Sequence, residues 1–200
     1  LPFTPHDHAL TRKALGDMAE LFDRLGDAQS AGQLKQNATA LRAAVLAHCV
    51  SSDAPGAGGA IFAAATDGRK SVFTDIPPGS LMKLPALGFV AEDDPVFVRT
   101  YRWLHSPNYK YSYSNEPYGL PGSYRLLFTT SWEVADHLRL KAGREQALKI
   151  LRASNWDAGI ITEGVSAATG RMDQAGRAFA TAAGYMAHAI CDTECTDRAK

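Results

Sequence analysis

The fold of this chain is decided by residues 10–48, which read LTRKALGDMAELFDRLGDAQSAGQLKQNATALRAAVLAH. Apolar side chains in the first half recur at intervals of three, four and seven, the spacing of one helical face: Leu10, Ala14, Met18, Leu21, Phe22 and Leu25. Gly26 ends this helix, and after Asp27 the same period returns at Ala31, Leu34, Ala38, Leu41, Val45 and His48. Because the turn between them is very short, the two helices are predicted to form an antiparallel hairpin.

The rest of the chain continues this helical pattern, with short strands in the loops. Residues 53–59 are predicted to form a loop, and Asp67-Gly68 a tight turn between strands at 60–65 and 71–74. Further helical segments are predicted at 80–84, from Pro95 to about His105, at 126–140, at 145–153 and from Gln174 to about Cys191. Residues 106–125, rich in tyrosine, proline and glycine, are predicted to form a long functional loop. The pattern indicates an all-α fold with short β-hairpins in its loops.

Composition narrows the class of partner. Lys plus Arg and Asp plus Glu both number 21, so the chain has no basic footprint for nucleic acid, and a neutral or polar partner fits better. No apolar run reaches the roughly 20 residues that span a bilayer, and residues 1–25 lack the pattern of a signal peptide. The Asn37-Ala38-Thr39 triplet matches a glycosylation acceptor, which leans towards export.

Several familiar site motifs are missing from the sequence. It has no glycine-rich phosphate loop, no Gly-x-Ser-x-Gly elbow, no paired CxxC motif and no His-Glu-x-x-His helix, so no metal site and no cofactor are predicted. Two histidines, His6 and His8, beside a helix start are interpreted as capping and solvated residues. The remaining histidines are predicted to lie singly on helix surfaces: His48, His105, His137 and His188.

What remains is a set of residues of the kind that bind sugars. Aromatic rings with a polar tip can stack on a pyranose ring, as Tyr109, Tyr111, Tyr118 and Trp132 could. Side chains that can take sugar hydroxyls are Asp75, Asn108 and Asn115. The same rings could equally pack the loop onto the helices.

Glu163 adds a carboxylate to this set. It follows Ile160 and Ile161 and precedes Val165, a stretch apolar enough to be buried. Glycoside hydrolysis needs two carboxyl groups across the scissile bond, one that protonates the leaving oxygen and one that acts as nucleophile or activates water. The alternative interpretation of Glu163 is a glutamate at the surface end of a turn.

At this point the sequence resembles glycoside hydrolase family 125, the metal-independent exo-α-1,6-mannosidases. The resemblance lies in Asp75–Phe89, in Asp94-Pro95, in the Asn108-Tyr109 loop and in Trp132. It continues in Ile161-Thr162-Glu163-Gly164-Val165, which is similar to the family's Met-His-Glu-Gly-Phe, and in Arg177-Ala178-Phe179-Ala180. These motifs keep the family's order over about residues 1–192.

The resemblance implies an (α/α)6 barrel and an exo-acting, inverting α-mannosidase in which Glu163 is the general base and Arg177 joins the substrate-binding residues. It places the general acid upstream of residue 1. The chain, 1–200, is then expected to be a single domain and the C-terminal half of a larger catalytic domain. A half-barrel exposes an apolar flank, so it is expected to bind the missing N-terminal half or to self-associate.

Two other functions stay open at this stage. One is another inverting (α/α)6 glycosidase that acts on α-glucosides. The other is a carbohydrate-binding or structural helical domain without catalysis. The sequence alone leaves open the sugar, the linkage and the compartment.

Overall fold

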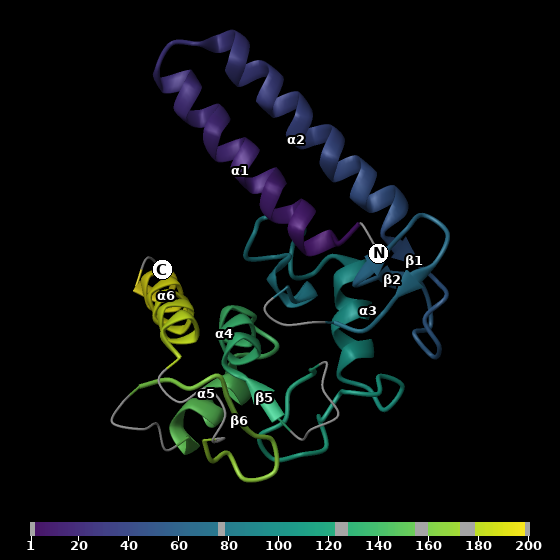
Figure 1. Ribbon diagram of the computed structural model, residues 1–200, viewed down its shortest axis with the longest axis vertical. Helices are drawn as coiled ribbons and strands as arrows, with labels where there is room; N and C mark the ends of the chain where they lie inside the picture. The colour runs from purple at the N-terminus through teal and green to yellow at the C-terminus, as the bar shows by residue number, and fades with distance from the viewer. Residues whose placement is uncertain (1–2, 76–78, 123–127, 155–159, 173–178, 199–200) are drawn as a thin grey trace. The chain divides into compact units, whose positions relative to one another are not determined.

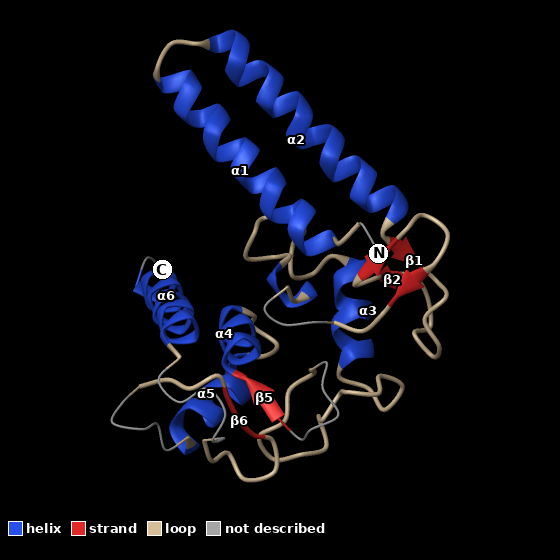
Figure 2. Ribbon diagram, in the orientation of Figure 1, coloured by secondary structure: helices blue, strands red, loops and turns tan. Residues whose placement is uncertain are grey.

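The computed structural model describes residues 3–75, 79–122, 128–154, 160–172 and 179–198 (Figures 1 and 2). Over these ranges the chain is mainly helical with short antiparallel strand pairs, so the predicted fold class is confirmed. Contacts divide the chain into two compact units, one of residues 1–74 and 83–100 and one of residues 75–82 and 101–200. The single domain over 1–200 stays a prediction, and the units are described separately.

The helical hairpin opens the first unit, as predicted. Helix α1 (Pro5–Arg24) has proline in its first turn, where the missing backbone N–H costs nothing. Gly26 turns the chain with a φ of 82°, a conformation that favours glycine. Asp27 then caps α2 (Ala28–His48), because its carboxylate accepts from Ser30 N over 3.0 Å. Figure 1 shows the two helices side by side.

The buried side of this hairpin is built of small residues. The buried side chains of the two helices are Pro5, Ala9, Ala19, Ala31, Ala38 and Val45. Larger apolar residues of the predicted α1 face remain exposed, namely Leu10 at 50%, Met18 at 47%, Leu21 at 54% and Leu25 at 70%. The hairpin therefore presents a row of apolar side chains to solvent, which we call the α1 stripe.

Two strand pairs complete the first unit. Strand β3 (Ala65–Thr66) pairs with β4 (Ser71–Val72) around the predicted Asp67-Gly68 turn. Strand β2 (Ile61–Phe62) lies within the predicted 60–65 strand and pairs with β1 (Val50–Ser51). The sequence did not predict β1, because a two-residue strand carries no periodic pattern. The Phe62 and Phe89 rings meet edge to face in the core of this unit, with centroids 6.4 Å apart.

Two helical elements contain the points in the sequence at which the chain leaves one unit and enters the other. A 3₁₀ turn covers Leu81–Lys83, within the predicted 80–84 segment. Helix α3 (Pro95–Leu104) begins where expected, because Asp94 accepts from Val96 N over 2.9 Å and Phe97 N over 3.1 Å.

The second unit holds the remaining elements and corrects two predicted helices. It contains β5 (Phe128–Thr130), α4 (Ser131–Arg139), α5 (Arg144–Ala153), β6 (Gly164–Ser166) and α6 (Ala180–Arg198). The helix predicted from residue 126 begins only at Ser131, because Phe128-Thr129-Thr130 pairs with β6 as a strand and Thr130 caps α4. The helix predicted from Gln174 begins at Ala180, and 174–178 lie outside the described residues.

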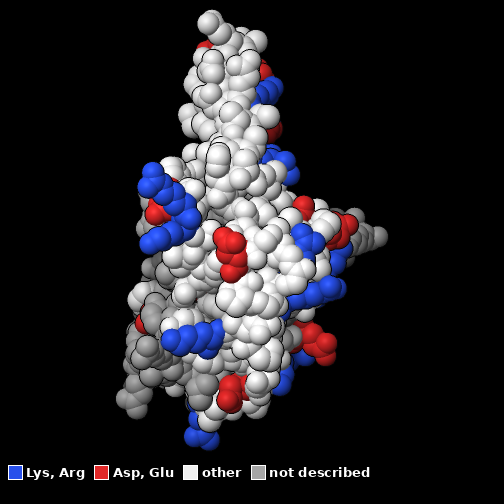
Figure 3. Space-filling model, turned by 90° about the vertical axis from the view of Figure 1, so that its right-hand side faces the viewer, with Lys and Arg blue, Asp and Glu red and all other residues white. Residues whose placement is uncertain are grey.

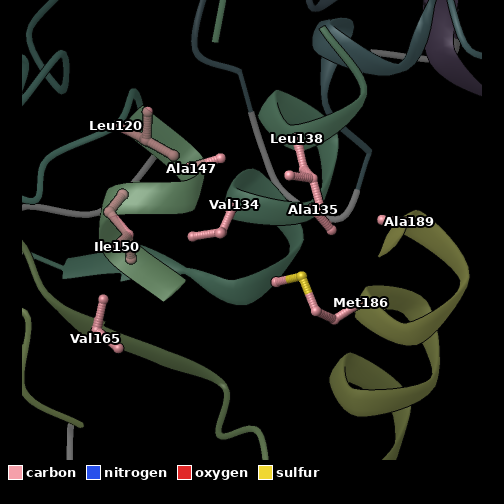
Figure 4. Close-up of a cluster of buried hydrophobic side chains, with 9 residues drawn as sticks. All are labelled: Leu120, Val134, Ala135, Leu138, Ala147, Ile150, Val165, Met186 and Ala189. Carbon is pink, nitrogen blue, oxygen red and sulfur yellow. The ribbon is translucent and has the colours of Figure 1, made fainter. Parts of the chain in front are cut away.

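The core of the second unit forms around α4. Figure 4 shows α4 between α5 and α6, with its apolar side chains directed at both. The cluster consists of Leu120, Val134, Ala135, Leu138, Ala147, Ile150, Val165, Met186 and Ala189. Burial of such side chains contributes about 1.5–3 kcal/mol for each large one. Since Val165 belongs to this core, the segment that carries Glu163 is anchored to it two residues after Glu163.

Charge is mixed on the surface. Figure 3 shows basic and acidic side chains interspersed on the face that it draws. Among the described residues, no helix combines the length and apolar character needed to cross a bilayer.

Candidate active site

Glu163 lies where the β5–β6 pair meets the first turn of α4. Strand β6 starts one residue later and pairs Gly164 with Thr130. Ser131 N donates to Glu163 O over 2.8 Å, and Ser131 Oγ donates to Thr162 O over 2.6 Å. The backbone on both sides of Glu163 is therefore fixed by a strand ladder and a helix N-terminus.

Glycine is required directly after Glu163. A Cβ atom on Gly164 would lie 2.4 Å from Thr129 O and 2.5 Å from Phe128 Cζ, far closer than a van der Waals contact. The fully buried Thr162 donates its hydroxyl to Gly164 O over 2.9 Å. The close pairing of β5 with β6 at Gly164 thus explains the glycine, and the Thr162 hydroxyl bond holds the backbone on either side of Glu163.

An aromatic pair stands next to this segment. Trp132 and Phe179 meet edge to face, with ring centroids 5.4 Å apart and an interplanar angle of 86°. Trp132 follows Ser131 in the chain, and Phe179 N donates to Ile161 O over 3.3 Å. Glu163, Trp132 and Phe179 are all half-buried, so their side chains are in part accessible. The predicted site residue Arg177 lies outside the described residues.

Asp75 is buried, and its carboxylate is occupied by the protein. It is 2% exposed, its Oδ2 accepts from Ser80 Oγ over 2.8 Å, and its Oδ1 accepts from Leu81 N over 2.9 Å. These bonds close the loop after Asp75 onto the start of the 3₁₀ turn. The geometry assigns Asp75 a structural role, and direct contact with a sugar stays a prediction.

Tyr109 holds the long loop in place through its ring and its hydroxyl. Its ring packs on Trp103 with centroids 5.2 Å apart, and its hydroxyl donates to Gly122 O and accepts from Asp75 N over 3.1 Å. Burial, then the Asp75 charge, raise the pKa of Tyr109 well above its usual range. The loop-packing alternative therefore describes Tyr109, which is 4% exposed.

The other residues of the long loop are more accessible. Asn108 and Asn115 are exposed, and Tyr111 and Tyr118 are half-buried. Tyr118 N donates to Ala167 O over 2.8 Å, which ties the loop to the turn that follows β6. Asn115 lines a pocket of about 330 Å³ together with Tyr101, His105, Glu116, Gln146 and Lys149. The structure thus brings Tyr118 to the turn after β6 and places Asn115 at a pocket.

Helix α4 also carries buried polar residues that the sequence interpretation missed. Glu133 and Asp136 are each 1% exposed and His137 is fully buried. The surface assignment of His105 and His137 is wrong, because their Nε2 atoms lie 3.1 Å apart inside the unit. The available signal was the spacing of Glu133, Asp136 and His137, which places three polar groups on one helical face. In the described part of the chain, no three His, Cys, Asp or Glu side chains gather as a metal site.

Antiparallel helical hairpins with short strand pairs are the building units of helical barrels, and this is the class that the fold defines. The model of the family described as metal-independent alpha-mannosidase (GH125) matches residues 2–191, so the chain belongs to that family.

A solved structure agrees with this fold. It is the Streptococcus pneumoniae metal-independent alpha-mannosidase in a non-productive substrate complex with alpha-1,6-mannobiose, which matches with a TM-score of 0.76 and 20% sequence identity. The match covers 96% of this chain and 46% of that chain, so this chain spans less than half of the relative's length. These matches establish the family and do not support the narrower assignment to its C-terminal half. A search of curated proteins found no match.

Proposed function

We propose that this chain forms part of an exo-acting, inverting α-mannosidase in which Glu163 is the general base. The observation that carries the proposal is the placement of Glu163: it is half-buried, its backbone is bonded to Ser131, the residue before Trp132, and Phe179, which contacts Trp132, is bonded to Ile161 of the same segment. A half-buried carboxylate on a backbone held by hydrogen bonds suits activation of a water molecule against a bound sugar. Membership of the mannosidase family supports the same chemistry.

An inverting reaction requires a second carboxyl group. The attacking water fits between two carboxyls about 6.5–9.5 Å apart, one that removes its proton and one that protonates the leaving oxygen. Asp75, Glu133 and Asp136 are only 1–2% exposed, so we assign none of the three as the general acid. We place the general acid in the part of the family's domain outside these 200 residues, since the structural relative is much longer.

The proposed substrate is a terminal α-1,6-linked mannose. The relative's complex with alpha-1,6-mannobiose supports this choice of sugar and linkage. Trp132 would offer a ring surface to the pyranose, and Tyr111, Tyr118, Asn108 and Asn115 are accessible enough to take part. For Asp75 and Tyr109 the proposed contribution is indirect, through the position of the loop.

The proposed partner is the remainder of the catalytic domain. The α1 stripe exposes four large apolar side chains in a chain that covers 46% of its relative. Burying such a row against further helices would complete the barrel. Without that partner, the same surface is expected to drive self-association.

The test is hydrolysis of α-1,6-mannobiose and of aryl α-mannosides by the complete protein, with and without Glu163→Gln. The amide cannot accept the water proton, so kcat should fall by about 10²–10⁴-fold. Glu145→Gln is the matched control, because Glu145 is exposed on α5. Full activity in the Glu163 variant would remove this residue from the mechanism. Activity on α-glucosides instead of α-mannosides would overturn the substrate, and sugar binding without turnover would indicate a binding domain.

A further inference from the structure

The second unit contains a histidine pair that the proposed reaction does not use. His105 follows α3 directly and His137 lies in the last turn of α4. Their Nε2 atoms are 3.1 Å apart, and their rings meet at 63° with centroids 5.1 Å apart. His137 is fully buried and His105 is half-buried. Two imidazoles therefore face each other, nitrogen to nitrogen, away from bulk water.

The outer ring nitrogens determine where the hydrogens are. Nδ1 of His105 lies 2.7 Å from Tyr101 O, and Nδ1 of His137 lies 2.8 Å from Glu133 O. A carbonyl oxygen only accepts hydrogen bonds, so each Nδ1 must carry a hydrogen. In a neutral imidazole, a hydrogen on Nδ1 leaves a lone pair on Nε2. Two neutral rings would thus point two lone pairs at each other across 3.1 Å.

We propose that His105 and His137 share one proton between their Nε2 atoms, so that the pair is a buried cation of single charge at neutral pH. The added proton turns the lone-pair contact into a charge-assisted N–H···N hydrogen bond. A second added proton would place two hydrogens in the same gap. The pair therefore holds one proton and excludes another.

In this proposal Glu133 supplies the opposite charge. Its Oε2 lies 3.6 Å from His137 Nδ1, and the side chain is 1% exposed. Other ionisable groups lie near the pair or near Glu133. Tyr101 stacks on His105 with centroids 4.0 Å apart, and Glu116 and Lys149 line the pocket beside His105. The Glu133 charge is one of the causes that raise the pKa of Tyr109 and of Tyr185. The Glu133 carboxylate is thus buried beside the pair, which in this proposal offsets the cost of the positive charge.

Burial opposes a charge on either ring taken alone. Burial lowers the pKa of His105 to about 4, and burial together with the charge of His105 lowers the pKa of His137 to about 3. These lowered pKa values do not include a hydrogen bond between the two Nε2 atoms. The Nε2–Nε2 hydrogen bond exists only in the protonated pair, so the first proton is held and the second is refused.

Gly143 leaves space for the His137 side chain. A Cβ atom there would lie 2.7 Å from His137 Cδ2 and 2.9 Å from His137 Cβ. Only glycine leaves room for the His137 ring as the chain turns from α4 into α5. The position of the His137 ring therefore depends on the glycine at position 143.

The shared proton makes this arrangement sensitive to pH. In this proposal the Nε2–Nε2 hydrogen bond outweighs the effect of burial, so the pKa for the first proton of the folded pair lies above the ordinary histidine value of about 6.5. The stability that it adds is complete below that pH and is lost as pH rises through the folded pKa. Since α4 also holds the backbone of Glu163 through Ser131, loss of the proton would loosen the support of the general base, a consequence that rests on the proposed function.

Nuclear magnetic resonance of the 200-residue chain, labelled with ¹⁵N-histidine, tests the proton directly. We expect one strongly deshielded proton that correlates with both Nε2 nuclei at pH 7.5 and disappears in His137→Gln. His48→Gln, at an exposed position at the end of α2, should leave it unchanged. Two neutral rings with unprotonated Nε2 atoms at pH 7.5 would overturn the proposal, as would a protonated Nε2 that makes no hydrogen bond to the other ring.

Thermal unfolding gives an independent readout that needs no enzymatic activity. The midpoint difference between the unsubstituted chain and His137→Gln should shrink as pH rises from 6 to 9, while the difference for His48→Gln stays constant. A gap that does not change with pH would contradict a shared proton. If His137→Gln does not fold, the resonance measurement on the unsubstituted chain decides the question. Loss of hydrolysis in Glu163→Gln with no bridging proton would separate failure of this inference from failure of the proposed function.

Discussion

Ser131 and Glu163 are joined backbone to backbone, with the Ser131 N–H donating to the Glu163 carbonyl over 2.8 Å. Ser131 is the first residue of α4, and its hydroxyl also donates to Thr162 O over 2.6 Å. One serine thus fixes two consecutive carbonyl groups of the proposed catalytic segment. The orientation of Glu163 depends on how α4 begins.

Ser131→Ala should weaken this support. Ser131 and Thr162 are both buried, so the Thr162 carbonyl would lose a partner at a cost of about 1–3 kcal/mol in unfolding free energy. In the complete enzyme kcat should fall more than KM rises, because the base is displaced while the sugar contacts remain. Denaturant unfolding and steady-state kinetics measure the two effects. Ser52→Ala, at an exposed loop position, is the control, and equal behaviour of the two variants would contradict the role of Ser131.

Gly164→Ala should separate β5 from β6. Its Cβ would sit 2.4 Å from Thr129 O, so the strands must move apart, and we expect a loss of more than about 2 kcal/mol in unfolding free energy. Gly184→Ala is the matched control, because a Cβ there meets nothing within 4 Å on α6. That variant should gain about 0.5–1 kcal/mol through helix propensity. Similar melting curves for the two variants would rule out the close approach of β5 to Gly164.

The raised pKa of Tyr109 predicts that the free energy of unfolding falls at alkaline pH. Its folded-state pKa is raised above the unfolded value of about 10, so its contribution is complete below that pH and is lost as pH rises beyond it. Tyr109→Phe should lower stability at neutral pH by about 1–2 kcal/mol, through loss of the hydroxyl bonds, and should flatten the decline above pH 10. Unfolding in denaturant at several pH values measures both effects. Tyr111→Phe, at a half-buried ring, serves as control. An unchanged slope in Tyr109→Phe would show that this phenol does not cause the decline.

The α1 stripe predicts concentration-dependent association of the isolated chain. Replacing Leu10, Met18 and Leu21 by serine should reduce the mass measured by analytical ultracentrifugation towards that of the monomer. Because these side chains are 47–54% exposed, thermal stability should change little. Val72→Ser, at a residue 38% exposed on β4, should leave association intact. A monomeric unsubstituted chain at high concentration would argue against the stripe as an interface.

Inversion predicts the anomer that is released first. In the proposed mechanism, water activated by Glu163 attacks the face opposite the leaving group, so an α-mannoside should release β-mannose before the anomers equilibrate. Proton resonance spectra recorded during the first turnovers distinguish the two anomers. Initial release of α-mannose would replace the proposed base by a nucleophile.

Much of the helical framework could be predicted, because its signals lie within a few residues of each other. Asp27, Asp94 and Gly26 act on neighbouring backbone groups, and the structure places the helix boundaries where they indicate. The predicted start of α4 failed for the opposite reason. Thr129 and Thr130 belong to a strand only because residues 164–165, far along the chain, pair with them.

The candidate site was predictable in its residue types but not in its geometry. Glu163 and Trp132 stand out in the sequence, and the structure holds their segments together through Ser131. Nothing in the sequence around Asp75 indicates that Ser80 and Leu81 occupy its carboxylate.

By itself, the sequence determined the helical class, the hairpin and the family motifs, because periodicity, capping and motif order are properties of local chain segments. Tertiary structure alone decided that His105 meets His137 and that leucines of α1 remain exposed. Their environment depends on which distant segments pack together. Burial and hydrogen-bond partners are set by that packing, and no short stretch of sequence specifies them.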